Sequence, residues 1–147
     1  YAAGPKDIIK AIGKIQSQST SNPSSISQAA AVEALNGNQG FIQKRSKAFK
    51  ERRDFVVKSL NNIKGINCLT PNGAFYVFPS CKGLLNKKTN LKTDTDFVQK
   101  LLEKSNVAVV QGSAFGLDGY FRISYATSMQ NLKKAMERIK TFCESLS

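Results

Sequence analysis

The 147-residue sequence contains no histidine, and this absence removes several kinds of active site together. There is no imidazole to act as a general base, no Cys/His pair and little scope for a zinc site. The three cysteines, Cys68, Cys81 and Cys143, are widely spaced and form no CxxC pair. An odd number of separated thiols, without a secretory signal, indicates a reducing compartment. We therefore expect a cytoplasmic protein in which Cys143 packs as an apolar side chain.

Long apolar runs are also absent, and acidic residues are few. No stretch approaches the roughly 20 apolar residues of a membrane-spanning helix, so we expect no membrane partner. With 22 basic against 10 acidic residues, the formal net charge of +12 allows a nucleic-acid-binding interpretation. The densest basic block covers residues 44–58, but apolar residues recur through it at helical spacing, which is typical of a solvated amphipathic helix. A basic nucleic-acid-binding module therefore stays an alternative only.

The remaining composition, with 41% hydrophobic and 22% charged residues, is typical of a folded domain. The chain opens on YAAGP without an initiator methionine, so we expect it to be a segment of a longer protein. In its first part, helices are expected to begin at Pro5, to cover residues 26–35 and to cover residues 39–62. The first of these presents one apolar face, formed by Ile8, Ile12 and Ile15.

The second part of the chain predicts a compact α+β unit of short strands and helices. Strands are expected in residues 66–70, 74–79, 107–111 and 120–125, and helices in residues 93–105 and after Ser128. The glycine-rich stretch 111–119 suits a tight turn better than a phosphate-binding loop, because a strand and not a helix follows it. Asp94 and Asp96 are explained by the first turn of a helix, whose dipole favours acidic residues.

The stretch GYFRISYATS, residues 119–128, carries the one residue pattern that suggests ligand binding. Its alternation places Phe121 and Ile123 on one face of a strand and Arg122 on the other. On this pattern alone Arg122 is either an ordinary solvated charge or an arginine held rigid to bind a carboxylate. No nucleophile–base group or metal-ligand cluster accompanies it, so we assign no catalytic and no metal-binding residue.

Five motifs occur in one order along nearly the whole chain: YAAGP at 1–5, STSNPSSISQ at 19–28, PNGAFYVFP at 71–79, VAVVQGSAFG at 107–116 and GYFRISYA at 119–126. Together they resemble the C-terminal third of the class I (fold-type I) pyridoxal-phosphate-dependent aminotransferases. The subgroup of aspartate and aspartate/prephenate aminotransferases is the most similar.

The resemblance implies the C-terminal part of an α/β pyridoxal-phosphate-dependent transferase fold. Residues 1–40 would end the large cofactor domain, and residues 41–147 would form a long linking helix and an α+β small domain. That small domain would contain a small mixed sheet covered by helices. The full-length enzyme would be a cytoplasmic homodimer that acts on amino-acid and 2-oxo-acid substrates and binds neither nucleic acid nor membrane.

The same resemblance implies residue roles. Arg122 would bind the α-carboxylate of the substrate, Ser19 or Thr20 would contact the site of the neighbouring subunit, and residues 73–76 would be structural. Gln111 stands where the family commonly has proline. The lysine that binds the cofactor, and the other main cofactor contacts, would lie upstream of this chain, so we assign no cofactor-binding residue here and expect the isolated segment to be inactive.

The implied reaction is reversible amino transfer between L-aspartate and 2-oxoglutarate, giving oxaloacetate and L-glutamate. Aminotransferases for aromatic amino acids, alanine or prephenate remain alternatives within the class, because side-chain selectivity depends largely on residues outside this chain. From other classes, the basic nucleic-acid-binding module and a purely structural or dimerising domain remain open.

Overall fold

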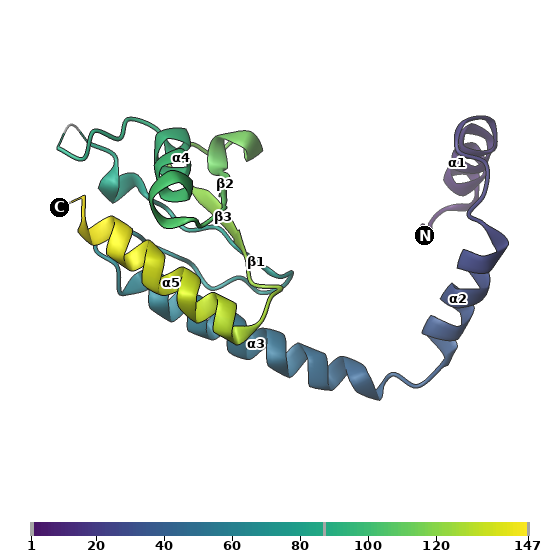
Figure 1. The fold of residues 1–147 in the computed structure, drawn as a ribbon. Coiled ribbons are helices and arrows are strands. Elements are labelled where there is room, and N and C mark those ends of the chain that lie inside the picture. The colour runs from purple at the N-terminus through teal and green to yellow at the C-terminus, as the bar shows by residue number, and fades with distance from the viewer. Residues whose placement is uncertain (1, 87, 147) are drawn as a thin grey trace. The chain divides into compact units, whose positions relative to one another are not determined.

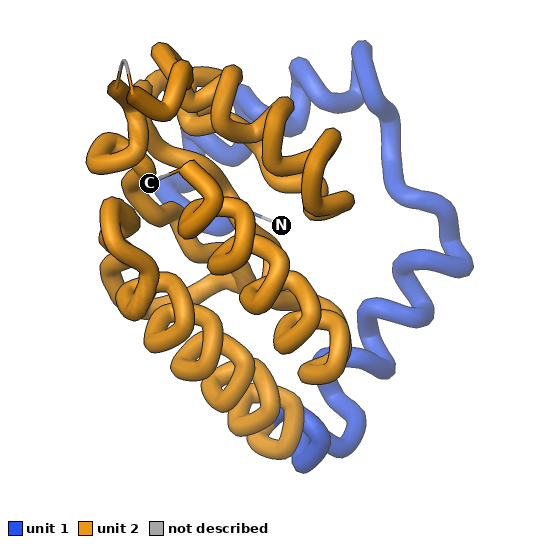
Figure 2. Tube along the Cα trace, turned by 60° about the vertical axis from the view of Figure 1, so that its left-hand side comes forward, with its two compact units in different colours: residues 1–42 blue, residues 43–147 orange. Residues whose placement is uncertain are grey.

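The computed structural model describes residues 2–86 and 88–146, which divide into two compact units at residue 42. Residues 1–42 form the first unit and residues 43–147 the second (Figure 2). The second unit holds the sheet and the hydrophobic core. Each unit is described by itself below.

The first unit is helical, as the sequence predicts. Helix α1 spans Lys6–Ser19 and follows Pro5, and α2 spans Ser25–Asn36 with Ser24 as its N-cap. The Ser24 hydroxyl accepts a hydrogen bond from the Ser27 N–H at 3.3 Å, which satisfies one free donor of the first turn. Neither helix contains a buried residue. The apolar face predicted for α1 is therefore uncovered among the described residues, with Ile15 71% exposed.

Helix α3 spans Gly40–Asn61 and runs from the end of the first unit through the second (Figure 1). Its predicted apolar stripe is confirmed in the second unit, where Val56, Leu60 and the following Ile63 are buried and Phe49 packs against them. The basic residues of the block occupy the remaining faces. The long helix is thus amphipathic, with its C-terminal half anchored in the core.

A three-stranded sheet lies beside this core. Strands β1 (Tyr76–Val77) and β2 (Val110–Gln111) flank β3 (Phe121–Ser124) in the order β1-β3-β2, and both pair with β3 antiparallel. The expected small mixed sheet is therefore wrong in its strand directions, since every named strand pair in the described residues is antiparallel. The α+β class of the unit is confirmed.

The strand expected in residues 66–70 is also wrong. Asn67 forms one isolated bridge with Ser80, and the pairing stops there. The reason lies at Cys68, whose N–H donates to the Asn61 side chain at 2.8 Å and whose carbonyl accepts from it at 2.9 Å. With both backbone groups taken by one amide side chain, the residue has none left for a strand ladder.

Helices α4 (Asp94–Ser105) and α5 (Met129–Glu144) complete the unit, with two short 3-10 helices, η1 (Lys82–Leu84) and η2 (Gly112–Phe115). Thr93 and Asp96 form a capping box that begins α4, and Ser128 caps α5. One face of β3 packs into the core through Phe121 and Ile123. Side chains from α3, α4 and α5 complete the core, among them Leu60, Phe97, Leu101, Leu132 and Ile139.

Candidate functional site

Strand β3 places Arg122 on the sheet face opposite the core. Phe121 and Ile123 are 0% and 7% exposed, whereas Arg122 between them is half-buried. The register pairs Arg122 with Val110 on β2, and pairs Ser124 with Tyr76 on β1. Because paired residues point to the same side of a sheet, Tyr76, Val110 and Arg122 share the outer face. The predicted alternation of this strand is confirmed.

Two aromatic rings hold the guanidinium of Arg122. Its Cζ lies 4.4 Å from the centroid of the Tyr76 ring and 4.4 Å from the centroid of the Phe115 ring. Both distances are within the range of cation–π attraction. Within residues 2–86 and 88–146 no carboxylate, carbonyl or hydroxyl accepts a hydrogen bond from this guanidinium. Its five N–H donors therefore have no protein acceptor in the described part of the chain.

Arg122 lines a cavity of about 180 Å³. Its walls are formed by Tyr76, Ala108, Val109, Val110, Arg122 and Ser124. Arg122 is the one charged residue of this lining, and aliphatic side chains of the segment before and in β2 make up much of the rest. The arrangement suits a small ligand with one carboxylate, because a planar guanidinium donates two parallel hydrogen bonds to such a group.

The turn that carries Phe115 is fixed by two features. Gly112 approaches the backbone of Leu117 and Tyr120 so closely that a β-carbon would collide with both. Asp94, at the start of α4, accepts a 2.7 Å hydrogen bond from the Ser113 N–H. Asp94 is 3% exposed, and among the described residues it is the one charged side chain that is buried. Asp96 serves the first turn of α4 locally, through its capping box with Thr93, whereas Asp94 has this tertiary role.

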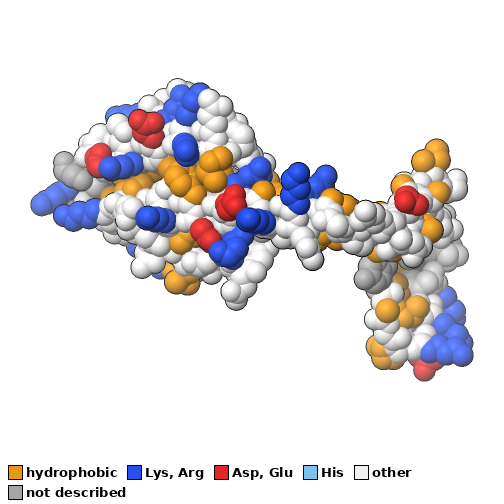
Figure 3. Space-filling model, turned by 90° about the horizontal axis from the view of Figure 1, so that it is seen from below, with side chains coloured by type: hydrophobic (Ala, Val, Ile, Leu, Met, Phe, Trp, Pro, Cys, Tyr) orange, Lys and Arg blue, Asp and Glu red, His pale blue; other side chains and the backbone are white. Residues whose placement is uncertain are grey.

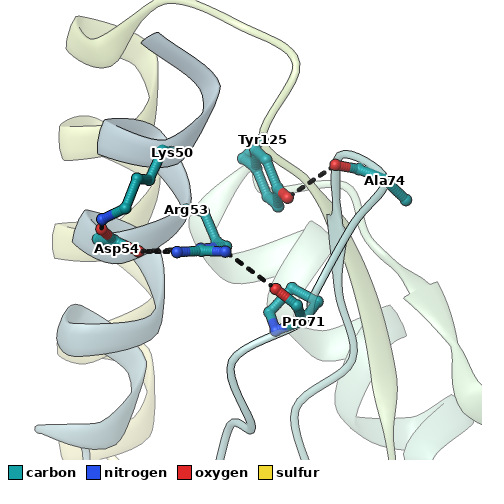
Figure 4. A network of polar contacts seen from close by, with 6 residues as sticks. All are labelled: Lys50, Arg53, Asp54, Pro71, Ala74 and Tyr125. Atoms are coloured by element: carbon teal, nitrogen blue, oxygen red, sulfur yellow. Dashed lines mark hydrogen bonds and ion pairs between the residues drawn. The ribbon is translucent and has the colours of Figure 1, made fainter. Parts of the chain in front are cut away.

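The segment that carries Tyr76 is fixed from the other side. Tyr125, directly after β3, donates its hydroxyl to the Ala74 carbonyl at 2.9 Å (Figure 4). Its N–H donates to the Phe75 carbonyl at 2.9 Å. Ala74 has a φ of 61°, a left-handed conformation that costs energy for a residue with a β-carbon. Both hydrogen bonds hold the chain in this conformation just before Tyr76.

The basic helix contributes to the same turn. Arg53 donates to the Pro71 carbonyl at 3.1 Å and to Asp54 at 2.9 Å, and Lys50 forms an ion pair with Asp54 at 2.6 Å (Figure 4). The hydrogen bonds from Lys50 and then Arg53 lower the pKa of the exposed Asp54 carboxyl. Part of the basic block is thus used internally. On the face shown in Figure 3, basic side chains of the larger unit alternate with acidic and apolar ones.

The other predicted site residues lie in the first unit. Ser19 is the last residue of α1 and Thr20 is its C-cap, and both are exposed. They belong to a different unit from Arg122, and their proposed contact with a neighbouring subunit stays a prediction. Gln111, in the position where proline was expected, ends β2 and pairs with Phe121.

The three cysteines are free and buried. Burial raises the pKa of Cys68 to about 11 and the pKa of Cys81 and Cys143 to about 12. The prediction that Cys143 is a packed thiol is confirmed, since it is 2% exposed. Searching residues 2–86 and 88–146 reveals no cluster of three or more metal-ligating side chains, and none of the helices there combines the length and apolar character of a membrane span.

Sequence reasoning proposed Arg122 as a site residue, which stays a prediction, and missed the residues around it. Tyr76 had been expected to be only structural, although its alternation in GAFYVF places it on the same face as Arg122 once β1 pairs with β3. Phe115 had a weaker signal, an aromatic residue between glycines in a turn. Asp94 had none, because its hydrogen bond joins residues 19 positions apart.

Comparison with known proteins identifies the family to which the chain belongs. The model of the aminotransferase class I and II family matches residues 1–139. An aspartate aminotransferase of Rhizobium meliloti (strain 1021) is 57% identical over 151 aligned residues, covering 100% of this chain and 37% of that protein. A probable aspartate/prephenate aminotransferase of Rhizobium leguminosarum bv. phaseoli is 58% identical, covering 97% of this chain and 37% of that protein.

The fold comparison agrees. The crystal structure of the aspartate aminotransferase from Rhizobium meliloti superposes with a TM-score of 0.93 at 57% identity, covering 99% of this chain and 38% of that one. The chain belongs to the aminotransferase class I and II family. The resemblance found in the motifs is confirmed, and so is the implied fold. The chain spans about 37% of the length of the curated relatives named above.

Proposed function

We propose that the complete protein is an aspartate aminotransferase, which transfers an amino group reversibly between L-aspartate and 2-oxoglutarate to give oxaloacetate and L-glutamate. Two similar proteins, named above, carry aspartate in their names, and they match this chain at 57% and 58% identity. At this identity over almost the whole chain, the same chemistry is the simplest expectation. Residues 1–40 would end the large cofactor domain and residues 41–147 would form the linking helix and small domain.

Arg122 is the substrate-binding residue of this proposal. The observation that carries it is an arginine that lines a cavity and whose guanidinium lies against two rings and has no acceptor among the described residues. A half-buried guanidinium has lost part of its hydration, so a ligand that supplies charged acceptors binds favourably there. The α-carboxylate of an amino acid offers two oxygens at the spacing that the guanidinium fork matches. Holding this carboxylate fixes the orientation of the bond to the α-hydrogen.

The cofactor of the complete protein would be pyridoxal 5'-phosphate, which supplies an electron-accepting ring when bound. The mostly apolar cavity beside Arg122 fits a substrate held against such a ring. As the family resemblance implies, we assign the main cofactor contacts to residues outside this chain. The enzyme would be a cytoplasmic homodimer, with Ser19 or Thr20 reaching the neighbouring subunit's site.

Prephenate as a second substrate is favoured by one observation, the name of the Rhizobium leguminosarum relative. The α-carboxylate site would serve alanine, aromatic and acidic substrates equally, because Arg122 contacts a group that all of them share. Nothing in the cavity lining selects one substrate side chain.

The experiment is a substrate survey with the purified complete protein loaded with the cofactor. Aspartate and 2-oxoglutarate should give the highest kcat/KM, measured by coupled detection of oxaloacetate. If alanine or an aromatic amino acid gives a higher kcat/KM, that amino acid and not aspartate is the preferred substrate. If no amino acid tested donates its amino group, the proposal that the complete protein is an aminotransferase is refuted.

A further inference from the structure

We infer that Tyr76 and Phe115 are positioning residues that clamp the Arg122 guanidinium and keep its donor edge directed toward the cavity. The inference rests on the proposed role of Arg122 in carboxylate binding and extends it to two residues. Neither ring needs to touch the substrate for this role. Both act through the arginine.

The two rings reach the guanidinium from opposite sides of its strand. Tyr76 belongs to β1 and Phe115 follows β2, and these strands flank β3 on its two edges. Each ring centroid lies 4.4 Å from the Arg122 Cζ. A guanidinium between two aromatic faces is attracted by both while its N–H groups, which lie in its plane, stay free. Aromatic faces therefore hold the cation without using the donors that a carboxylate needs.

Holding the arginine in advance has a specific advantage. A long arginine side chain has many rotamers, and fixing one of them on binding weakens affinity. The clamp restricts the rotamers before the ligand arrives. A bidentate contact gains most from this restriction, because both hydrogen bonds depend on the orientation of one plane.

The clamp is itself supported on each side by a buried residue. Asp94 holds the η2 turn through the Ser113 N–H, so Phe115 stays placed although it is 48% exposed. Tyr125, 2% exposed, holds residues 74 and 75 by two hydrogen bonds and so fixes the approach to Tyr76. Phe115 also contacts Phe78 edge-on at a centroid distance of 5.9 Å.

The test compares Tyr76→Leu and Phe115→Leu with the unaltered complete protein. One readout is the rate at which phenylglyoxal modifies Arg122 in the ligand-free protein, followed by mass spectrometry of its peptide. The second is the dissociation constant of maleate, a non-reacting dicarboxylate, measured by calorimetry. Leucine keeps the apolar bulk but removes the ring. Phe115→Tyr, which keeps the ring, tests rescue, and Leu117→Ala on the same loop, with its side chain 43% exposed, is the matched control.

Each leucine variant should raise both the modification rate of Arg122 and the maleate dissociation constant about 2- to 5-fold, the scale of one exposed cation–π contact. Phe115→Tyr and Leu117→Ala should leave both values unchanged. Unchanged modification in the leucine variants overturns the clamp. Faster modification of Arg122 with an unchanged maleate dissociation constant would show that the clamp exists but does not contribute to carboxylate binding.

Arg122→Lys separates this inference from the proposed function. If Arg122→Lys leaves maleate binding unchanged, Arg122 is not the carboxylate ligand and the proposed function loses its site residue. The modification rates of Arg122 in the leucine variants still decide whether the clamp exists.

Discussion

The Asp94 carboxylate accepts a 2.7 Å hydrogen bond from the Ser113 N–H and thereby joins the start of α4 to the turn that carries Phe115. The contact links the hydrophobic core to the turn that carries Phe115, because Phe97 and Leu101 of the same helix are fully buried. The turn is therefore anchored although it is mostly exposed, and the position of Phe115 depends on Asp94, a residue of another helix.

Removing this anchor should destabilise the protein. Asp94→Ala leaves the Ser113 N–H without its acceptor and should lower the free energy of unfolding by about 1–3 kcal/mol. Asp94→Asn keeps an acceptor oxygen and should lose less. Urea unfolding of the complete protein measures both. Asp118→Ala is the matched control on the same loop, because the Asp118 side chain is exposed and has no ion pair in the described residues; its loss should stay within about 0.5 kcal/mol. Equal losses at both positions would show that the hydrogen bond contributes nothing.

The Tyr125 hydroxyl should stabilise the segment just before β1. Tyr125→Phe removes its 2.9 Å hydrogen bond to Ala74 and keeps the ring in the core. We expect a loss of about 0.5–1.5 kcal/mol in unfolding free energy, the scale of one neutral hydrogen bond. Tyr120→Phe is the control, since the Tyr120 hydroxyl has no hydrogen bond among the described residues, and its stability should not change. A Tyr125→Phe protein as stable as the original would show that the left-handed turn at Ala74 holds without this contact.

Asp96 should give the stability a specific pH dependence. Hydrogen bonds from the backbone N–H groups of Lys92 and then Thr93 lower its pKa in the folded state, below the ordinary aspartate value of about 3.9. A lowered folded pKa means that the carboxylate stabilises the fold above the unfolded pKa, and that this contribution disappears as the pH falls through the folded pKa. The stability difference between the original protein and Asp96→Ala should be constant near neutrality and shrink below about pH 4.

Thermal unfolding at a series of pH values checks this prediction. Thr95→Ala, an exposed change in the same helical turn, should show no such pH-dependent difference. If the stability difference between the original protein and Asp96→Ala stays unchanged down to pH 2, the capping carboxylate is not its cause.

The cysteines should resist alkylation in the native state. Burial raises the pKa of Cys68 to about 11 and that of Cys81 and Cys143 to about 12, so at pH 8 only about one thiol in a thousand or fewer is the reactive thiolate. Iodoacetamide should modify all three slowly, and rapidly in urea, when each peptide is followed by mass spectrometry. Fast native modification of Cys81 would contradict its complete burial.

The sequence predicted those features that a local pattern determines. The helices follow from apolar spacing and capping residues such as Ser24 and Ser128. The place of Arg122 on the sheet face opposite the core follows from strict alternation on β3. The family followed from five motifs in order, which is information that no single element contains.

Features that depend on tertiary partners escaped prediction. Residues 66–70 have the composition of a strand, yet the Asn61 side chain takes the backbone groups of Cys68. The clamp of Tyr76 and Phe115 depends on strand order and on a turn fixed by a distant carboxylate. Strand directions follow from connections in three dimensions, and so the mixed sheet was the wrong expectation.

The most direct test of the central claim is Arg122→Lys in the complete protein, assayed with several amino-acid substrates. Lysine keeps the charge but cannot make the bidentate contact. We predict a fall in kcat/KM that corresponds to a loss of about 1.5–3 kcal/mol of transition-state stabilisation, the scale of a hydrogen bond to a charged group. The fall should be the same for aspartate, alanine and an aromatic amino acid, because they share the α-carboxylate. A loss confined to aspartate would place Arg122 at the side-chain carboxylate, and unchanged kinetics would remove it from the substrate site.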